Sequence, residues 1–266
     1  MRVALSIRYA GTAYHGWQKQ TELVSLDDVV STAVERFAGF RPALTCAGRT
    51  DAGVHAAGQL VDFETEVLRE PASWVRGVNH FLPADVSVSS MTEVPADFSS
   101  RFSATSRTYE YWIDNTPSRD PLTAPLATWV FRPLDLEPMR RAASYLLGEH
   151  DFTSFRASAC QAKTPVRTVQ AIDFVREGTM VGFRITANAF LYHMVRNIVG
   201  CLVYVGIGRE SPEWLGRVLE ARDRTVAAPT FAPQGLYFAK ATYPERFGIP
   251  EPAPTPWGHL FGTPRR

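Results

Sequence analysis

Strand-like and helix-like hydrophobic patterns alternate along almost the whole chain, and this alternation limits the possible folds more than any single motif. Apolar residues recur at every second position in residues 2–9, as in a half-buried strand. At Ser25 a capping box opens a helix whose apolar face extends to Phe37. Because both patterns return in the second half of the chain, we expect an α+β fold.

The same patterns predict two α+β halves that meet near residue 105. The first half is 1–105, the second is 106–243, and 244–266 forms a tail in which six of the 23 residues are Pro. We expect this tail to be extended and peripheral. Further strands are predicted to end near Cys46 and to cover 60–63, 85–90, 107–113, 169–175, 180–187 and 235–242, and further helices to cover 71–82, 138–147, 190–205 and 212–221.

Composition excludes several classes of protein. A hydrophobic fraction of 45% argues against disorder, and three cysteines without a CxxC pair argue against a disulfide framework or a zinc ribbon. No stretch of 18 residues lacks charge, and the N-terminus does not resemble a signal peptide, so we expect a cytoplasmic protein with no membrane contact.

The near balance of 28 basic and 27 acidic residues hides a contrast between segment 152–209, net +5, and segment 54–97, net −5. The first is a candidate anion-binding surface.

The densest cluster of unusual residues surrounds Asp51, in a loop between two strand patterns. Two glycines, Gly48 and Gly53, let the backbone turn closely around it. In the simplest interpretation this loop is a turn in which Asp51 satisfies backbone N–H groups. In the functional interpretation Asp51 is a nucleophilic carboxylate held beside Arg49. Cys46 is an alternative nucleophile, although a cysteine at a strand end is usually a small buried hydrophobic residue.

Two further clusters carry candidate binding residues. In the apolar helix expected at 190–205, polar residues form one stripe, and an Arg in a buried helix needs an anionic partner, which Asp51 offers to Arg196. Alternatively the stripe faces water. In the strand at 107–113, Tyr109 either belongs to the core or presents a face on which a base stacks. The polar stripe consists of His193, Arg196, Asn197, Gly200 and Tyr204.

The motifs of several enzyme classes are absent. The chain has no Walker A loop, G-x-G-x-x-G, HExxH or G-x-S-x-G, and the pattern of a zinc deaminase fails because no CxxC follows His55. We therefore expect chemistry that needs neither a nucleotide cofactor nor a metal.

Several blocks together resemble the TruA family of tRNA pseudouridine synthases. The resemblance runs from about residue 2 to residue 243, and its most specific block surrounds Asp51. The blocks occur in the family's order: GT and GWQ at 11–12 and 16–18, GRTDAGVHA at 48–56, RF at 101–102, RTYEY at 107–111, HDFTSF at 150–155, NAFLYHMVRNIVG at 188–200 and GLY at 235–237.

This resemblance implies an isomerase that converts uridine to pseudouridine at positions 38, 39 and 40 of the tRNA anticodon stem-loop, without a cofactor. It further implies two similar α+β halves, with antiparallel or mixed sheets forming a continuous scaffold around a central RNA-binding cleft, in a homodimer. By the same resemblance, Asp51 is the nucleophile, Tyr109 contacts the target base, Arg196 pairs with Asp51, and Arg49 helps to displace and hold the flipped nucleotide.

The chain departs from the family pattern at three places, which puts the range of tRNA contacts in question. They are Ala10, where an Asp is frequent, the segment 24–26 and Tyr192, whose position is often basic. A related enzyme with a different target uridine is one rival interpretation, and a non-catalytic RNA-binding module is another. Asp51 argues against the second, because a pure binder has no need of a carboxylate facing an anionic ligand.

Overall fold

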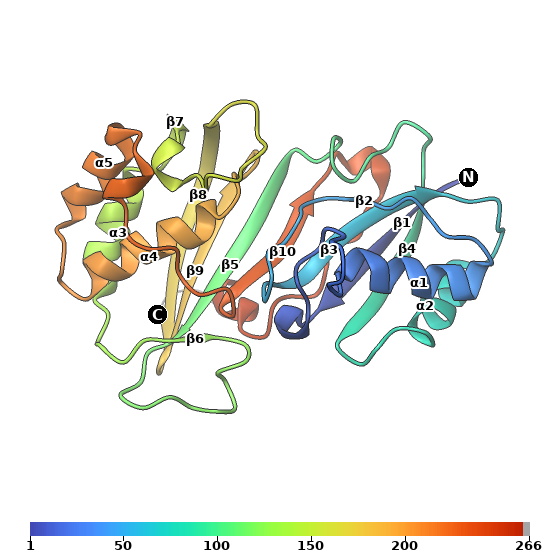
Figure 1. Cartoon of the computed structure of the whole chain (residues 1–266), viewed down its shortest axis with the longest axis horizontal. Coiled ribbons are helices and arrows are strands. Elements are labelled where there is room, and N and C mark those ends of the chain that lie inside the picture. The colour runs from blue at the N-terminus through green and yellow to red at the C-terminus, as the bar shows by residue number, and fades with distance from the viewer. Residues whose placement is uncertain (263–266) are drawn as a thin grey trace. The chain divides into compact units, whose positions relative to one another are not determined.

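The computed structural model describes residues 1–262, and these fall into two compact units (Figure 1). Unit 1 consists of Met1–Arg107 and Tyr237–Thr255, and unit 2 consists of Thr108–Leu236 and Pro256–Arg266, of which the last four residues are not described. Each unit has its own strands and its own helices, which confirms the predicted α+β class.

The sheet of unit 1 is mixed. Strand β1 pairs antiparallel with β3 and β4, whereas β10 runs parallel to β3 and places Tyr237 opposite His55. The sequence does not reveal that β10 returns to the first half of the chain, because a strand's hydrophobic pattern does not encode its partner. The strand order is β4 (Val86–Val94), β1 (Arg2–Tyr9), β3 (His55–Glu64), β10 (Leu236–Thr242), with β2 (Thr45–Cys46) also on β3.

Two helices of unit 1, α1 (Leu26–Ala38) and α2 (Pro71–Asn79), begin and end at local signals in the sequence. The Ser25 hydroxyl accepts the Asp28 N–H at 3.2 Å and caps α1, which ends at Gly39 with φ 82°. The fully buried Trp74 of α2 packs edge-on against Phe63 of β3, with ring centroids 5.9 Å apart. Helix α2 therefore covers one face of this sheet.

The opposite face of β3 is also covered, and this explains why the strand is buried from His55 to Phe63. A Cβ on Gly58 would lie only 2.5 Å from the ring of Pro252, and the Asp62 carboxylate accepts a hydrogen bond from the backbone of Ser100. The sequence predicted only 60–63 as a strand. Its first half is rich in small residues, which leave no alternating hydrophobic pattern.

The tail is less peripheral than expected. It contains 3-10 turns at Glu245–Phe247 and Gly258–Gly262, and Phe247 is 4% exposed because it packs against Phe98 at 4.9 Å in unit 1. In unit 2, Trp257 packs against the fully buried Trp112 at 5.8 Å. The expectation of a peripheral tail was wrong for these residues, because proline content says nothing about aromatic anchors between the prolines. The tail's last four residues lie outside the described residues.

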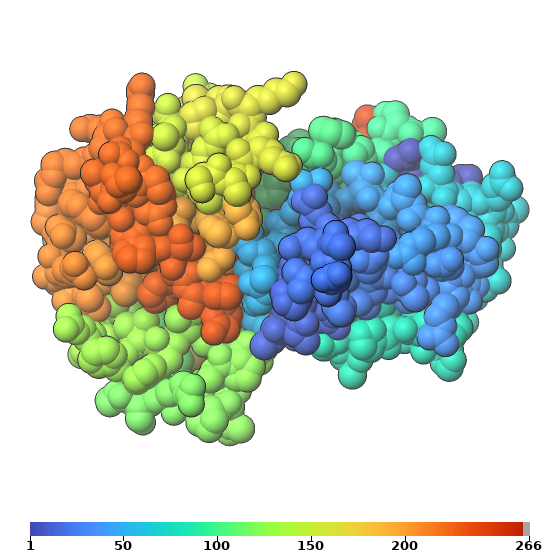
Figure 2. All heavy atoms as spheres, viewed as in Figure 1, coloured from blue at the N-terminus to red at the C-terminus, as the bar shows by residue number. Residues whose placement is uncertain are grey.

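The sheet of unit 2 contains the predicted hairpin of two long strands. Strands β8 and β9 pair antiparallel and are joined at Gly178, whose φ of 56° suits glycine. Segment 156–165, yellow in Figure 2, lies at the surface of this unit. The strand order is β5 (Ser106–Asp114), β9 (Met180–Ala187), β8 (Val166–Glu177), β7 (Gly148–Asp151), with β6 (Thr128–Trp129) beside β5.

Helices α3 (Leu136–Ser144), α4 (Met194–Gly206) and α5 (Pro212–Ala221) pack together in unit 2 (Figure 1). Helix α5 covers the predicted 212–221, from a proline at its first turn to Arg222 in the left-handed conformation. Most residues of α4 are buried, as its apolar sequence requires. Within residues 1–262, no helix has the length and hydropathy needed to cross a bilayer.

Helix α4 begins at Met194, four residues later than predicted. His193 precedes it in the left-handed conformation, with φ 62°, so it cannot belong to the helical stripe. The preceding residues are tied elsewhere: the Tyr192 carbonyl accepts the Ala157 N–H at 3.1 Å, and the Asn188 side chain accepts the Thr168 N–H at 3.0 Å. These contacts between distant segments override the local apolar pattern.

Candidate functional site

The loop 47–54, called the Asp51 loop below, connects β2 to β3 in unit 1. Its Thr50 is buried, Asp51 is half-buried and Arg49 is exposed. The Val54 N–H donates to the Asp51 carbonyl at 3.1 Å, which closes a tight turn at the position the sequence predicted. This turn accounts for backbone groups of the loop and leaves the role of the Asp51 side chain open.

The segment 11–17, in the loop after β1, holds the backbone of the Asp51 loop. The Trp17 N–H donates to the Thr50 carbonyl at 2.9 Å, and the Gly53 N–H donates to the Tyr14 carbonyl at 3.2 Å. Gly16 permits this approach, because its φ is 90° and a Cβ there would lie 2.7 Å from the Thr50 oxygen. The Thr50–Asp51 peptide unit and the Ala52–Gly53 peptide unit are thus both fixed to a neighbouring segment.

A buried polar network supports the loop from the sheet. The Gln59 side chain donates to the Gly48 carbonyl at 2.6 Å and accepts the Gly48 N–H at 3.4 Å, and the Tyr9 hydroxyl shares a hydrogen bond of 2.8 Å with the Thr50 hydroxyl. Gln59 also donates to Tyr9 at 3.5 Å. Burial raises the pKa of Tyr9, so its hydroxyl stays protonated at neutral pH.

Sequence reasoning missed Tyr9 and Gln59 as residues of the site. Tyr9 continues the apolar alternation predicted for this half-buried strand, so nothing in the pattern singles it out as a site residue. The available signal was Gln59 itself, a polar residue within an otherwise apolar segment, because a buried amide requires hydrogen-bond partners.

His55, at the start of β3, is buried and serves the packing of the site. Its Nδ1 accepts the Gly11 N–H at 3.0 Å, so this ring nitrogen carries no proton. Its ring stacks on Tyr237 of β10 with centroids 4.7 Å apart. His55 therefore connects segment 11–17 to the sheet beneath the Asp51 loop.

Cys46, the alternative nucleophile, has an environment that suppresses its reactivity. Although the residue is half-buried, desolvation of its thiol raises the pKa to about 12, against the opposing effect of the nearby Arg49 and Arg101 guanidinium groups. A neutral thiol is a weak nucleophile. This environment disfavours Cys46 relative to Asp51.

Tyr109 lies on β5 in unit 2, at the start of the strand as predicted. Tyr109 is only 9% exposed, and its ring packs edge-on against Phe190 with the ring centroids 4.9 Å apart. The structure therefore places Tyr109 among the packed residues of unit 2, and its contact with a base stays a prediction.

Arg196 lies in the first turn of α4 and is half-buried. Its Nε donates to the Phe231 carbonyl at 2.8 Å, and its own carbonyl accepts the Phe231 N–H at 3.2 Å. Arg196 and Tyr109 belong to unit 2, whereas Arg49 and Asp51 share one loop of unit 1. Pairing between Asp51 and Arg196 stays a prediction.

Part of the predicted polar stripe on α4 binds protein groups and does not face water. Asn197 is fully buried; it donates to the Phe155 carbonyl at 2.8 Å and accepts the Thr230 hydroxyl at 2.7 Å. Gly200 lies against the Pro229 carbonyl, which a Cβ would approach to 2.5 Å. The stripe thus binds the segment that follows α5 and ends at Phe231.

Among residues 1–262, no group of three or more His, Cys, Asp or Glu side chains has the arrangement of a metal site.

Comparison with known proteins shows which proteins this chain is similar to. A family model for tRNA pseudouridine synthase matches residues 142–244. The tRNA pseudouridine synthases A of Paraburkholderia phytofirmans and Methylibium petroleiphilum are 50% and 51% identical to this chain, over 98% and 96% of its length and 97% and 98% of theirs. That of Burkholderia cenocepacia is 49% identical over 98% of this chain and 97% of its own. The chain therefore belongs to the TruA family of tRNA pseudouridine synthases, and it is an isomerase.

Proposed function

We propose that this enzyme isomerises uridine to pseudouridine at positions 38, 39 and 40 of the tRNA anticodon stem-loop, with Asp51 as the nucleophile. The observation that carries the proposal is the fixation of the Asp51 loop. The Thr50–Asp51 and Ala52–Gly53 peptide units are hydrogen-bonded to segment 11–17, and the side chains of Tyr9 and Gln59 hold the loop from the sheet. A carboxylate that must meet one reacting atom benefits from such a rigid support.

The reaction breaks the N1–C1′ bond of the nucleotide and forms a C5–C1′ bond. The Asp51 carboxylate attacks either the ribose C1′ or the uracil ring, and the same oxygen leaves when the bond to C5 forms. The base turns between these steps, C5 loses its proton, and N1 gains one. Atoms and electrons balance, so the reaction involves no net oxidation and no hydrolysis. A glycosidase would instead need a second carboxylate beside the first.

The remaining predicted residues serve the substrate in this proposal. The uridine must leave its stack, which costs a few kcal/mol. Arg49, exposed two residues before Asp51, displaces and holds the nucleotide, and Tyr109 contacts the base. Arg196, already oriented by Phe231, pairs with the Asp51 carboxylate.

The deciding experiment maps pseudouridine in an unmodified tRNA transcript after incubation with the enzyme. Wild type should modify uridines 38–40, Asp51→Asn should modify none, and Asp173→Asn should match wild type. Asp173 is a suitable control because it is exposed on β8 of unit 2. Modification only at other positions would support the rival with a different target. Full activity of Asp51→Asn would remove the carboxylate from the mechanism.

The family resemblance also leads us to propose a homodimer that acts in the cytoplasm. Light scattering of the purified enzyme tests the first point. A mass near twice 29.6 kDa is expected, and a mass of one chain at micromolar concentration would contradict it. Fractionation of the source cells tests the second, and recovery in the membrane fraction would contradict it.

A further inference from the structure

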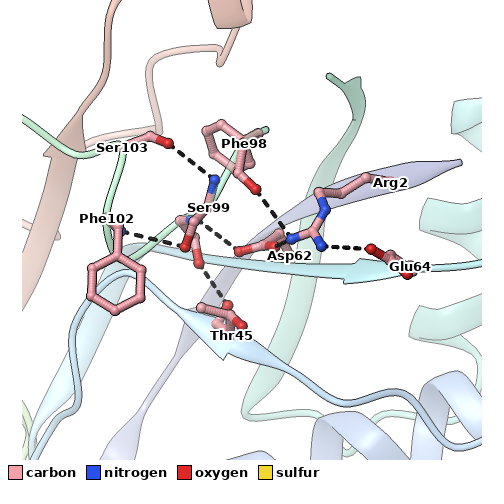
Figure 3. Close-up of polar contacts among 9 residues, drawn as sticks. Arg2, Thr45, Asp62, Glu64, Phe98, Ser99, Phe102 and Ser103 are labelled. Carbon is pink, nitrogen blue, oxygen red and sulfur yellow. Dashed lines mark hydrogen bonds and ion pairs between the residues drawn. The ribbon is translucent and has the colours of Figure 1, made fainter. Parts of the chain in front are cut away.

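An aromatic side chain stands exposed on a fixed turn of unit 1, close to the Asp51 loop. Phe102 is 78% exposed, in contrast to Phe98 of the same turn, which is 1% exposed. Figure 3 shows the Phe102 ring pointing away from the polar contacts that hold the turn's backbone. The turn comprises residues 98–103 and is called the Phe102 turn below.

The Phe102 turn is anchored to the sheet by buried hydrogen bonds. Asp62 of β3, fully buried, accepts the Ser100 N–H at 2.7 Å, and the Ser100 hydroxyl donates to the Thr45 carbonyl at 2.6 Å (Figure 3). The Tyr243 hydroxyl donates to the Ser100 carbonyl at 2.7 Å. Arg2 forms an ion pair of 2.6 Å with Asp62 and so compensates the buried charge.

Hydrogen bonds inside the turn fix Phe102 itself. The Ser99 N–H donates to the Ser103 hydroxyl at 3.0 Å, and the Phe102 N–H donates to the Ser99 hydroxyl at 3.4 Å (Figure 3). The backbone that carries the exposed ring is therefore already in place when a ligand arrives. Binding then costs little additional conformational entropy.

The Phe102 turn is connected through Arg107 to the first residue of the Asp51 loop, Ala47. Arg107 donates to the Ala47 carbonyl at 3.3 Å, to the Ala104 carbonyl at 3.2 Å and to the Arg101 carbonyl. Ala47 lies four residues before Asp51. Arg107 therefore ties the backbone next to Phe102 to the loop that carries the proposed nucleophile.

A guanidinium group lies beside the Phe102 ring. The Arg101 guanidinium lies 5.0 Å from the Phe102 ring centroid, and Arg101 and Arg49 both lie near enough to Cys46 to act on its thiol. Within residues 1–262, no carboxylate lies within ion-pair distance of Arg49 or Arg101, and both are exposed. An exposed ring beside the exposed Arg101 suits a ligand that combines flat aromatic rings with anionic groups, and a nucleic-acid strand has this chemistry.

We propose that Phe102 stacks on an unpaired base of the substrate RNA near the target nucleotide, while Arg101 binds a phosphate beside that base. This inference rests on the proposed function and adds a second base contact to it, outside the Asp51 loop. Stacking explains why an apolar ring is kept in water on a rigid support. It also requires an aromatic ring, whereas a simple apolar contact would accept any side chain of similar size.

The test compares Phe102→Ala, Phe102→Leu and Phe102→Trp with wild type. Replacement by Ala or Leu should lower kcat/KM for tRNA about tenfold, and Trp should restore it, because one stacked base contributes about that factor. The matched control is Phe131→Ala, since Phe131 is 59% exposed and has Arg132 near its ring at 5.8 Å in unit 2. Thermal unfolding should be the same for all variants, because the ring makes few contacts.

Binding measurements assign the effect to RNA. In the Asp51→Asn background, Phe102→Ala should weaken tRNA binding about tenfold. Arg101→Ala should weaken it too and reduce the salt slope of log K by about 0.7, as expected for one lost contact to a single strand. Arg132→Ala is the control.

The outcomes separate this inference from the proposed function. If the wild-type enzyme forms no pseudouridine in tRNA, the proposed function is contradicted. An active wild type in which Phe102→Ala matches Phe131→Ala, or in which Leu restores activity as well as Trp, overturns only the stacking contact. A changed oligomeric state with unchanged RNA binding would also overturn it, because Phe102 would then contact a second copy of the chain.

Discussion

The side chain of Gln59 pairs with the backbone of Gly48 in both directions, as a neighbouring strand would. Its nitrogen donates to the Gly48 carbonyl at 2.6 Å and its oxygen accepts the Gly48 N–H at 3.4 Å. Gln59 is fully buried, so its amide has no access to water that could replace these bonds. One side chain of β3 thus fixes the first glycine of the Asp51 loop.

Replacement of Gln59 should therefore affect both stability and turnover. Gln59→Met keeps the size of the side chain but removes the partners of the N–H and carbonyl of the half-buried Gly48, at a cost of about 1–3 kcal/mol in the free energy of unfolding. If Gln59 positions the loop, kcat should fall while KM for tRNA changes little. Urea unfolding and steady-state kinetics measure the two effects. Loss of stability with unchanged kcat at a temperature where the variant is folded would reduce Gln59 to a structural role.

The hydroxyl pair of Tyr9 and Thr50 should behave as one unit. Tyr9→Phe and Thr50→Val each break the 2.8 Å hydrogen bond and leave the other hydroxyl without this partner. The double variant removes both hydroxyls, so its loss of stability should be smaller than the sum of the two single losses. We expect a coupling free energy of about 1 kcal/mol from a double-mutant cycle of urea unfolding. Additive losses would show that the two hydroxyls act independently.

How far the sequence predicts this structure depends on whether the determining contacts are local. Strand β1 and helix α5 follow their patterns because alternation, Pro212 and the following turn lie within the segments themselves. The start of α4 could not be predicted, since Ala157 and Thr168, far away in the chain, hold residues 188–192 out of the helix. The return of β10 to β3 was hidden for the same reason.

Likewise, one part of the candidate site could be predicted from the sequence and another part could not. The Asp51 loop stands out because its residue types are unusual at close spacing, and a family resemblance supports it. Its supports do not stand out: Tyr9 has the pattern of a core residue, and the role of Gln59 depends on a glycine eleven positions earlier in the chain. A polar residue in a buried strand is the one signal that sequence reasoning can use for such supports.

The end of the tail should stabilise unit 2 through Arg184. This guanidinium lies 2.6 Å from the buried Glu110 carboxylate and 3.9 Å from the Phe261 ring centroid. Phe261→Ala should lower the midpoint of thermal unfolding, because it exposes Arg184 and the fully buried Trp112. The loss should be about 3 kcal/mol or less, below the usual cost of truncating a buried aromatic residue, because the tail packs at the edge of the unit.

A matched variant distinguishes this packing from surface charge. Lys240→Ala removes an exposed ion pair of 2.8 Å with Glu251 in unit 1 and should cost about 0–1 kcal/mol. Calorimetry of both variants, with Trp fluorescence as a probe of Trp112, measures the difference. Equal midpoints for Phe261→Ala and wild type would show that the tail contributes no stability.

The three cysteines should differ sharply in reactivity with pH. Burial raises the pKa of Cys46 to about 12 and that of Cys201 to about 11. Desolvation of Cys160 acts in the same direction, but the N–H groups of Tyr192 and Ala162 and the Arg156 guanidinium outweigh it and lower the pKa of this thiol. Because the thiolate is the reactive form, iodoacetamide at pH 8 should modify Cys160 first.

The pH dependence of the alkylation rate shows whether the pKa of each thiol is raised or lowered. The alkylation rate of Cys160 should level off at a lower pH than that of a free cysteine, about 8.5, because its thiolate fraction saturates earlier. The rates of Cys46 and Cys201 should still be rising at pH 10. Mass spectrometry of peptides resolves the three sites, and the guanidine-unfolded chain, in which all three should react alike, is the control. Fast labelling of Cys46 in the folded enzyme would restore this thiol as a candidate nucleophile beside Asp51.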